Sequence, residues 1–305
     1  MFSAKKLLLA LIALGAIVPA AQATPIDQVI LSKEGALPSL YSSDLTRNIF
    51  VKQIHSHNDY WRDIPLYTAL SYGVQSVEAD VWLYNGTLFV GHHEAALTSA
   101  RTFASLYIDP LVDLLTQANP VNAFTADQAT PNGVFDTDST KTLYLFVDLK
   151  TEGNATWPYV LEALQPLRDL GYLSSVNGTT FTSGPVTVIG TGNTPADQVL
   201  SKSTRDYFVD APVANLTGYS SLTSPIASGG FRSIVGDLAP SGMNLTQLAL
   251  IKELIDGAHE KGIYTRFWDV PWWPVRLRNS LARQLIDLSS DFFNADDLQW
   301  ASTLA

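Results

Sequence analysis

The chain of 305 residues contains no cysteine. This absence excludes disulfide bonds, thiolate nucleophiles and metal sites with cysteine ligands. A domain of this length can bury an adequate core without disulfides, so an extracellular location remains compatible with the composition. Basic residues are also scarce, because 19 lysines and arginines stand against 29 aspartates and glutamates, giving a net charge of −10. Since an acidic surface repels a polyphosphate backbone, we do not expect nucleic acid as a partner.

Long apolar runs are absent beyond the N-terminus. Two lysines precede an apolar run at residues 7–18, which is too short for a comfortable membrane span. The sequence Ala21-Gln22-Ala23 then matches the pattern of a signal-peptidase site. We therefore expect a signal peptide at residues 1–23 and a secreted mature domain at residues 24–305. An uncleaved membrane anchor is the alternative.

Sequons for N-glycosylation agree with export. Glycosylation requires an exposed Asn-x-Ser/Thr sequence in a protein that enters the secretory pathway. Five such sequons occur, at Asn85, Asn154, Asn177, Asn215 and Asn244. We expect an extracellular glycoprotein with glycans on several of them.

Short strand-like runs alternate with helix-like stretches along the whole chain. The 46% hydrophobic content indicates a globular protein. Eight strands are predicted near residues 49–54, 76–81, 142–149, 185–189, 206–209, 232–235, 262–268 and 291–294. Eight strands alternating with helices predict an α/β fold, a single-domain (β/α)8 barrel of the TIM type.

Two polar stretches rich in turn-forming residues predict long loops, at residues 119–141 and 211–231. Neither reads as a domain linker, because strands continue on both sides. They would either cover the mouth of an active site or form surface insertions.

Carboxylates at the ends of two predicted strands suggest a metal site. Glu78 and Asp80 are two residues apart and so share one face of a strand. Asp148 and Lys150 share a face in the same way after a run of five apolar residues. Buried carboxylates need a compensating cation, and oxygen ligands favour Mg²⁺ or Ca²⁺. Solvated strand ends or a local Asp148–Lys150 ion pair are the simpler alternatives.

Four of the 5 histidines lie in two short segments, "HSHNDYW" and "VGHH". A histidine titrates near neutral pH and can transfer protons, although a lone histidine is more often structural. His57 follows the first predicted strand and precedes Asn58, whereas His55 should lie deeper and be structural. His92 and His93 follow a short extended run. Lys150 would hold a phosphate beside the metal.

Aromatic residues gather after the seventh predicted strand, in "RFWDVPWWP". Trp268 should share a face with Arg266 and is a candidate wall for a substrate. Trp272 and Trp273 follow in a loop, where they would either touch a lipid surface transiently or pack over the barrel end.

Together, "HSHNDYW", "SVEADVWL", "VGHH", "RTFASLYIDPL" and "VDLKT" resemble segments of the phospholipase-C-like phosphodiesterase superfamily, which includes glycerophosphodiester phosphodiesterases. The nearest resemblance is to the fungal family called altered inheritance of mitochondria protein six. The resemblance implies that Glu78, Asp80 and Asp148 bind one divalent cation, most simply Mg²⁺, with Ca²⁺ as the alternative. It implies that His57 is the first catalytic histidine and leaves His92 and His93 open as the second. Lys150, Asn58 and Trp268 would contact the substrate.

The resemblance implies a secreted, metal-dependent phosphoric diester hydrolase or lyase. Its substrate would be a phosphodiester small molecule or lipid headgroup, and no obligate protein partner is inferred. A metal-dependent amidohydrolase could instead bind zinc through His55 and His57, but the later predicted strands lack further histidine ligands. A glycosidase would leave the histidines unexplained. A barrel that only binds a ligand is the remaining alternative.

Overall fold

The computed structural model describes residues 45–126 and 128–304. The expected signal peptide, residues 1–23, lies outside this part of the chain. No helix in the described part combines the length and apolar character needed to cross a bilayer.

Parallel strands form the centre of the fold. One sheet has the order β13-β1-β2-β4-β7-β9, and a second has the order β10-β11-β12. Their bounds are Lys52–Ser56 for β1, Val74–Tyr84 for β2, Leu143–Leu149 for β4, Val186–Gly192 for β7, Phe208–Val209 for β9, Ala211–Pro212 for β10, Ile226–Gly230 for β11, Tyr264–Trp268 for β12 and Phe293–Ala295 for β13. The remaining strand of the first sheet, β3 (Thr87–Val90), pairs with β2 as an antiparallel hairpin.

The two sheets meet at both ends. Only Asp210 separates β9 from β10, so one stretch of chain pairs with β7 on one side and with β11 on the other. An isolated parallel bridge between Arg266 and Phe292 joins β12 to the start of β13. The order of strands is therefore that of an eight-stranded (β/α)8 barrel of the TIM type, as the sequence predicts.

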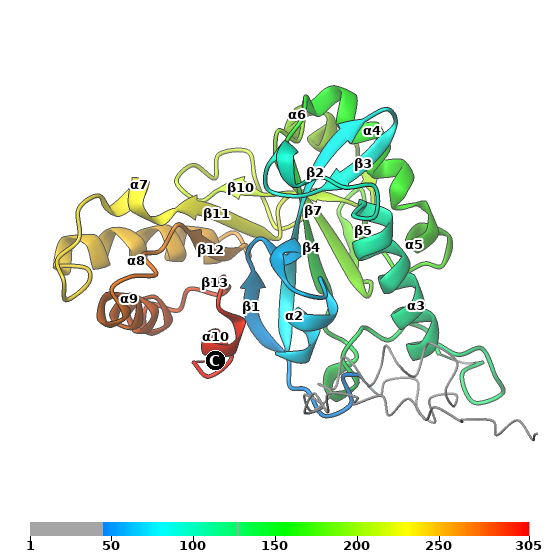
Figure 1. The fold of residues 1–305 in the computed structure, drawn as a ribbon, viewed down its shortest axis with the longest axis horizontal. Coiled ribbons are helices and arrows are strands. Elements are labelled where there is room, and N and C mark those ends of the chain that lie inside the picture. The colour runs from blue at the N-terminus through cyan, green and yellow to red at the C-terminus, as the bar shows by residue number, and fades with distance from the viewer. Residues whose placement is uncertain (1–44, 127, 305) are drawn as a thin grey trace, which may run out of the picture. The chain divides into compact units, whose positions relative to one another are not determined.

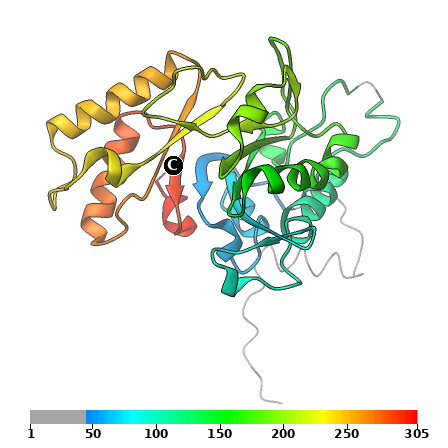
Figure 2. The same ribbon diagram turned by 90° about the horizontal axis from the view of Figure 1, so that it is seen from above.

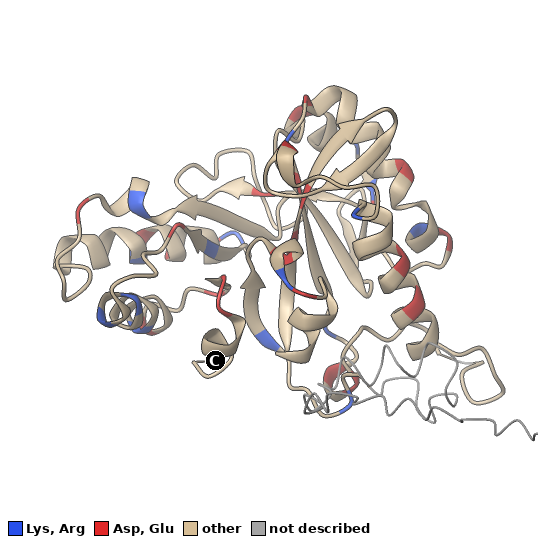
Figure 3. Cartoon of the chain, viewed as in Figure 1, with Lys and Arg blue, Asp and Glu red and all other residues tan. Residues whose placement is uncertain are grey.

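Helices lie outside the strands on both sides of the fold. In Figures 1 and 2, α3, α4 and α5 accompany β2, β4 and β7, whereas α7, α8 and α9 accompany β11 and β12. The helices are α2 (Tyr67–Ser71), α3 (Asp109–Ala118), α4 (Gly153–Ala163), α5 (Gln165–Asp169), α6 (Ala196–Leu200), α7 (Phe231–Val235), α8 (Leu245–His259), α9 (Val275–Asp287) and α10 (Leu298–Ala301). Acidic residues are spread over many of these elements (Figure 3).

The core has an inner and an outer layer. Phe146 of β4, Phe208 of β9 and Phe292, which immediately precedes β13, pack together, and each is fully buried or nearly so. On β2, the apolar residues that alternate with the two carboxylates, Val77, Ala79 and Val81, are fully buried. Polar and apolar residues thus alternate along β2, which places Glu78 and Asp80 on one face.

The sixth strand is not where the sequence analysis placed it. Residues 232–235 belong to α7, and the strand is β11, Ile226–Gly230. The segment "IASGG" carries little apolar volume, so it lacks the usual strand signal. Its glycines are needed for close packing, because a Cβ on Gly229 would lie 2.6 Å from Val213 Cγ1.

The second predicted loop is consequently shorter than expected, since it ends at residue 225, before β11. It packs against α8, where Leu216 and Tyr219 join the cluster around Ile251 and Ile255. The first predicted loop, 119–141, connects α3 to β4, and Thr137 Oγ1 donates to the carbonyl of Ile49. The contact with Ile49, which precedes β1, places the first loop near the N-terminal ends of the strands, whereas the second loop leaves the end of β10 and packs on α8.

A small antiparallel sheet was not expected from the sequence. It has the order β6-β5-β8, formed by Thr180–Thr182, Ser175–Asn177 and Thr204–Arg205. Strands of two or three residues are too short to give a period-2 signal.

Candidate active site

Three carboxylates meet at the C-terminal ends of β2 and β4. Asp80 and Asp148 are paired positions in the register of the two strands, and Glu78 lies one pleat below Asp80. One oxygen from each of the three side chains lies within 4.8 Å of the others. Within residues 45–126 and 128–304, this is the only group of three or more acidic or histidine side chains with the spacing of a metal site.

Lys150 follows β4 and reaches back over the carboxylates. Its Nζ lies 2.8 Å from Asp148 Oδ2 and 3.1 Å from Asp80 Oδ2. Burial lowers the pKa of Lys150, but the two carboxylates outweigh that effect and the net shift is upward. The ammonium group is therefore charged at neutral pH, beside the place where the three carboxylates converge.

A glycine makes room for Asp148. Gly192 at the end of β7 has φ +62°, and a Cβ there would lie 2.0 Å from Asp148 Oδ1. No larger residue could occupy this position while Asp148 stays in place.

His57 stands at the edge of the carboxylate cluster. Its Nδ1 lies 2.9 Å from Asp296 Oδ1, and its Nε2 lies 3.8 Å from Glu78 Oε2. Burial lowers the pKa of His57, but the hydrogen bond to Asp296 and the charge of Glu78 together raise it by more than burial lowers it, so the net shift is upward. A carboxylate on Nδ1 also fixes the ring orientation and directs Nε2 into the site.

The segment after β1 is held by a buried network. The Asp59 carboxylate accepts hydrogen bonds from Ser56 Oγ, from the backbone N–H of Leu66 and from Tyr107 Oη. Asn58 adopts a left-handed conformation, with φ 50°, and its backbone N–H donates to Glu78 Oε2 at 3.0 Å. The motif "HSHNDYW" thus orients His57 and one carboxylate together.

His92 lies on the other side of the cluster, and Tyr60 connects it to the carboxylates. Tyr60 Oη donates to Asp80 Oδ2 at 2.7 Å and lies 3.0 Å from His92 Nδ1. Because the phenol proton points to a carboxylate, Nδ1 of His92 is the donor in the second contact, which leaves Nε2 unprotonated. Burial, followed by the neighbouring His93 and Lys150, lowers the pKa of His92.

His93 is placed differently. It is exposed, and the only described contact of its side chain is an edge-to-face packing on His92 with the ring centroids 4.4 Å apart. The geometry therefore brings His92, but not His93, to the carboxylates.

His55 is buried below His57 and is not available to a metal. Its Nδ1 is hydrogen bonded to Ser76 Oγ at 2.7 Å, and its Nε2 faces the guanidinium group of Arg266. Burial and that neighbouring cation lower the pKa of His55 to about 3. With both nitrogens engaged, His55 cannot pair with His57 as a zinc ligand, which removes the basis of the amidohydrolase alternative.

Arg266 and Asp210 form a buried ionic layer beneath the site. Arg266 NH1 lies 3.8 Å from Glu78 Oε1, and its NH2 lies 3.9 Å from Asp210 Oδ2. Arg266 Nε donates to Ser228 Oγ at 2.9 Å, and the guanidinium stacks over Phe146. Burial raises the pKa of Glu78, but its hydrogen bond with His55 and the charge of Arg266 lower it by more, so the carboxylate is ionised despite its burial.

The residues fit a hard divalent cation. Lys150 is the cation among the three carboxylates, and Arg266 beneath them is shared between Glu78 and Asp210, so negative charge exceeds positive charge at the site. Burial and the charges of Glu78 and Asp148 raise the pKa of Asp80 to about 7. An all-oxygen donor set with surplus negative charge is the chemistry that Mg²⁺ and Ca²⁺ select.

A cavity of about 760 Å³ opens beside His57. Six tryptophan and phenylalanine residues line it, and Trp268 at the end of β12 is one of them. The other aromatic lining residues are Trp61, Trp272, Trp273, Phe293 and Trp300. Asp296, which holds His57, also lies on its wall, so the cavity borders the proton-transfer group directly.

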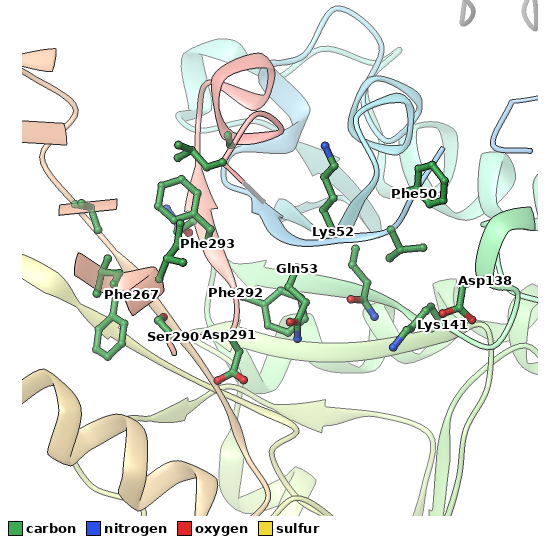
Figure 4. A pocket seen from close by; sticks show the side chains of 18 of the residues that line it. Phe50, Lys52, Gln53, Asp138, Lys141, Phe267, Ser290, Asp291, Phe292 and Phe293 are labelled. Atoms are coloured by element: carbon green, nitrogen blue, oxygen red, sulfur yellow. The ribbon is translucent and has the colours of Figure 1, made fainter. Parts of the chain in front are cut away.

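A second cavity, of about 620 Å³, lies near the N-terminal ends of β1 and β2. Figure 4 shows Lys52, Lys141 and Asp138 among the side chains around it. None of the three clustered carboxylates lines it, so it is separate from the candidate active site.

Three contributors to the site escaped the sequence analysis: Tyr60, Asp296 and Arg266. Tyr60 stands in the quoted motif "HSHNDYW", three residues after His57, and could have been recognised there. Asp296 lies 239 residues from His57 along the chain, so only the assembled barrel reveals their contact.

The five sequon asparagines, Asn85, Asn154, Asn177, Asn215 and Asn244, are all exposed. Asn244 also caps α8, because its side chain accepts from the backbone N–H of Gln247. Exposure satisfies the steric requirement for glycosylation at each position.

Comparisons with known proteins agree with the motifs. A family model described as AIM6-like phosphodiesterase domain matches residues 43–210. The chain is 48% identical over 292 residues to the altered inheritance of mitochondria protein 6 homolog of Arthroderma benhamiae, covering 92% of this chain and 93% of that protein. It is 36% identical over 288 residues to altered inheritance of mitochondria protein 6 of Lachancea thermotolerans, covering 84% of this chain and 66% of that protein.

Among solved structures, a glycerophosphodiester phosphodiesterase from Parabacteroides distasonis is similar, with a TM-score of 0.46 and 12% sequence identity. The similarity covers 84% of this chain and 98% of that one.

Proposed function

Since the chain belongs to the AIM6-like phosphodiesterase domain family, we propose that it cleaves a phosphodiester with the help of one divalent cation. The observation that carries the proposal is the convergence of Glu78, Asp80 and Asp148 between two histidines. The histidines are His57 on one side and His92 on the other. This arrangement supplies charge neutralisation and two proton-transfer groups around one point.

The cation would be held by Glu78, Asp80 and Asp148, with Mg²⁺ favoured over Ca²⁺. A bound divalent cation neutralises charge on phosphoryl oxygens. Lys150 would add a second positive charge to the same oxygens, since its Nζ already lies among the carboxylates. Asn58 would help to orient the substrate, because it lies beside both His57 and Tyr60.

The two histidines would divide the proton transfers. His57, whose pKa is raised, would donate a proton from Nε2 to the leaving oxygen. His92, whose pKa is lowered, would accept a proton at Nε2 from the attacking hydroxyl group. If that hydroxyl belongs to water, the product is a hydrolysed ester, and if it belongs to the substrate, the product is a cyclic phosphate. His93 would have no part in this exchange.

The substrate would be derived from a lipid. The aromatic residues and carboxylates that line the cavity beside His57 suit an apolar or cationic group better than an anionic one such as a nucleotide phosphate. Trp268 would form the wall nearest to the strand end that carries Arg266.

Purified protein should be assayed against a panel of phosphodiesters that includes glycerophosphodiesters, lysophospholipids and inositol lipids, with added Mg²⁺ and with a chelator. We expect cleavage of at least one lipid-derived member, and loss of that activity with the chelator. An Asp80→Asn, Asp148→Asn double variant should behave as the chelated protein does. Full activity of the metal-free protein would contradict the role of the cation.

We also propose that the protein is secreted and glycosylated, from the N-terminal sequence and the exposed sequons. N-terminal sequencing of extracellular protein should begin near Thr24, and glycosidase treatment should increase its electrophoretic mobility. An intracellular protein that retains Met1 would argue against export.

A further inference from the structure

The segment between β12 and α9 carries an unusual amount of exposed aromatic surface. Trp272 is 72% exposed and Trp273 is 65% exposed, and their ring centroids lie 6.4 Å apart. Trp61 also lines this cavity, is 56% exposed and contacts the ring of His92, with the ring centroids 5.0 Å apart. Single exposed apolar residues are ordinary, but several large ones around one opening mark an interaction surface. We call Trp61, Trp272 and Trp273 the tryptophan rim.

The tryptophan rim is not explained by packing over the barrel end. Trp157, a core tryptophan, is 2% exposed, and Trp300 packs on Phe293 and under the guanidinium group of Arg278 at 3.8 Å. The only described ring contact of Trp272 and Trp273 is with each other. Most of the surface of both indole rings therefore faces solvent. Exposure of this apolar surface to water is unfavourable, and a binding partner that covers it would gain free energy.

The charges beside the rim are mainly negative. Asp269, Asp296 and Asp297 line the same cavity with side chains that are about half exposed, and Arg278 is the one lysine or arginine among the described lining residues. Arg278 lies 3.6 Å from Asp297 and packs on Trp300, and Arg232, which does not line the cavity, lies 3.6 Å from Asp269, so three carboxylates stand against two arginines at this edge. An anionic lipid surface would be repelled by this edge and by the net charge of −10.

A surface whose outermost groups are cationic would fit both features. Choline-headgroup lipids carry no net charge, but they expose quaternary ammonium groups, which bind to indole faces and to carboxylates. Trp and Tyr also favour the boundary between headgroups and acyl chains. A second copy of this chain fits less well, because self-association would bring the carboxylates of Asp269 and Asp296 toward like charges.

We propose that the tryptophan rim docks the protein on a surface of choline-headgroup lipid. The rim and His57 line one cavity, so docking would set the opening of the candidate active site against the lipid layer. This last step rests on the proposed function, whereas the docking itself does not.

The test measures binding of the whole protein to vesicles, which requires no turnover. Wild-type protein is mixed with phosphatidylcholine vesicles or with phosphatidylglycerol vesicles of the same acyl composition, and bound protein is measured by co-sedimentation. We expect stronger binding to phosphatidylcholine. A Trp272→Ser, Trp273→Ser double variant should bind phosphatidylcholine about tenfold more weakly or worse, because it loses two large apolar contacts.

The matched control is a Val121→Ser, Phe124→Ser double variant. These residues are 100% and 97% exposed in the loop before β4, away from the cavity, and the variant should bind as wild type does.

Asp269→Asn tests the contribution of negative charge. Asparagine is the suitable replacement, because Asp269 has φ 57° and asparagine tolerates that conformation. It should weaken binding to phosphatidylcholine and strengthen binding to phosphatidylglycerol.

Equal binding by wild type and by the tryptophan double variant, with both folded by circular dichroism, would overturn the proposal. A preference of the wild-type protein for phosphatidylglycerol would also overturn it. So would a double variant that binds vesicles as wild type does but has a lower mass in light scattering, because that result would show that the rim mediates self-association. A protein that binds phosphatidylcholine but cleaves no phosphodiester would retain the docking proposal and lose the proposed function.

Discussion

At the scale of single residues, His57 is the side chain on which the proposed chemistry depends most directly. It is fixed by Asp296 and presents Nε2 to the carboxylate cluster. We expect His57→Ala to lower turnover by about a hundredfold or more, the usual cost of losing an acid–base group. Metal content, measured by elemental analysis, should change little. His259→Ala is the control, since His259 pairs with Asp291 away from the carboxylates. Wild-type turnover by His57→Ala would refute the two-histidine mechanism.

The neighbouring histidines His92 and His93 offer a sharper comparison. Only His92 contacts Tyr60 and lies near Asp80, at 3.4 Å from its Oδ2. We expect His92→Ala to lose about a hundredfold in turnover, whereas His93→Ala should stay near the wild-type rate. Steady-state kinetics of the two variants decides. The reverse order would assign the second catalytic role to His93.

The pKa shifts of the two histidines predict how the rate depends on pH. The rate should rise as His92, with its lowered pKa, loses its proton. It should fall again as His57, with its raised pKa, loses its own. A plot of kcat/KM against pH should therefore be bell-shaped for the wild type. His57→Ala should lose the descending limb, and a descending limb that persists in this variant would assign it to another group.

Much of the candidate site could be predicted from residue patterns. The two-residue spacing of Glu78 and Asp80, and the abrupt end of an apolar run at Asp148, both depend on the local geometry of a strand. The partners that tune the site come from distant strands. Asp296 and Arg266 could not be assigned to His57 and Glu78 before the register of β12 and β13 was known.

At the scale of elements, the C-terminal end of β7 packs against the metal-binding carboxylates, because Gly192 lies beside Asp148. Gly192 has no room for a Cβ, which would lie 2.0 Å from Asp148 Oδ1. We expect Gly192→Ala to displace Asp148 and weaken Mg²⁺ binding by about tenfold or more, in the range seen for groups that support metal ligands. Calorimetric titration of the variant with Mg²⁺ measures this.

Gly171→Ala is the matched control for backbone strain. Gly171 also has a left-handed conformation, with φ +70°, but nothing lies within 4 Å of an added Cβ. Each variant should lose about 1 kcal/mol of unfolding free energy from the strained alanine, and Gly192→Ala should lose more, because its Cβ would also lie 2.8 Å from the carbonyl oxygen of Leu149. Only Gly192→Ala should lose metal affinity, and an equal effect in both variants would mean that strain alone is responsible.

Elements with strong apolar patterns were predictable, and those with weak ones were not. β4 was found because five consecutive apolar residues precede Asp148. The sequence does not predict β11, because "IASGG" has mostly small side chains. Its glycines are required for close packing against Val213 and Trp268. Residues 232–235 include the β-branched residues Ile234 and Val235, which predict a strand, although the segment forms part of α7. Packing between elements, rather than local preference, decided both cases.

At the scale of the whole molecule, the barrel holds ionisable groups in its interior, and this should make its stability depend on pH. The Asp210 side chain is largely buried, with a hydrogen bond from Thr191 and the guanidinium group of Arg266 at 3.9 Å. Its Oδ1 has no hydrogen-bond partner among the described residues. Burial raises the pKa of Asp210 to about 6, although Arg266 acts in the opposite direction.

Since the pKa of Asp210 is higher in the folded state than in the unfolded state, the folded protein holds more protons between about pH 4 and pH 6. The free energy of unfolding should therefore fall as pH rises through this window, by about 3 kcal/mol from this group at most. Asp210→Asn is neutral at every pH and should lack this fall. Urea denaturation of both proteins at several pH values, with a chelator present, isolates the effect as the difference between them.

Asp136→Asn is the control. It alters an exposed carboxylate and should leave the pH dependence of the unfolding free energy as it is in the wild type. If the difference between wild type and Asp210→Asn stays constant from pH 4 to pH 7, Asp210 is ionised throughout, and Arg266 rather than burial governs the interior of the barrel.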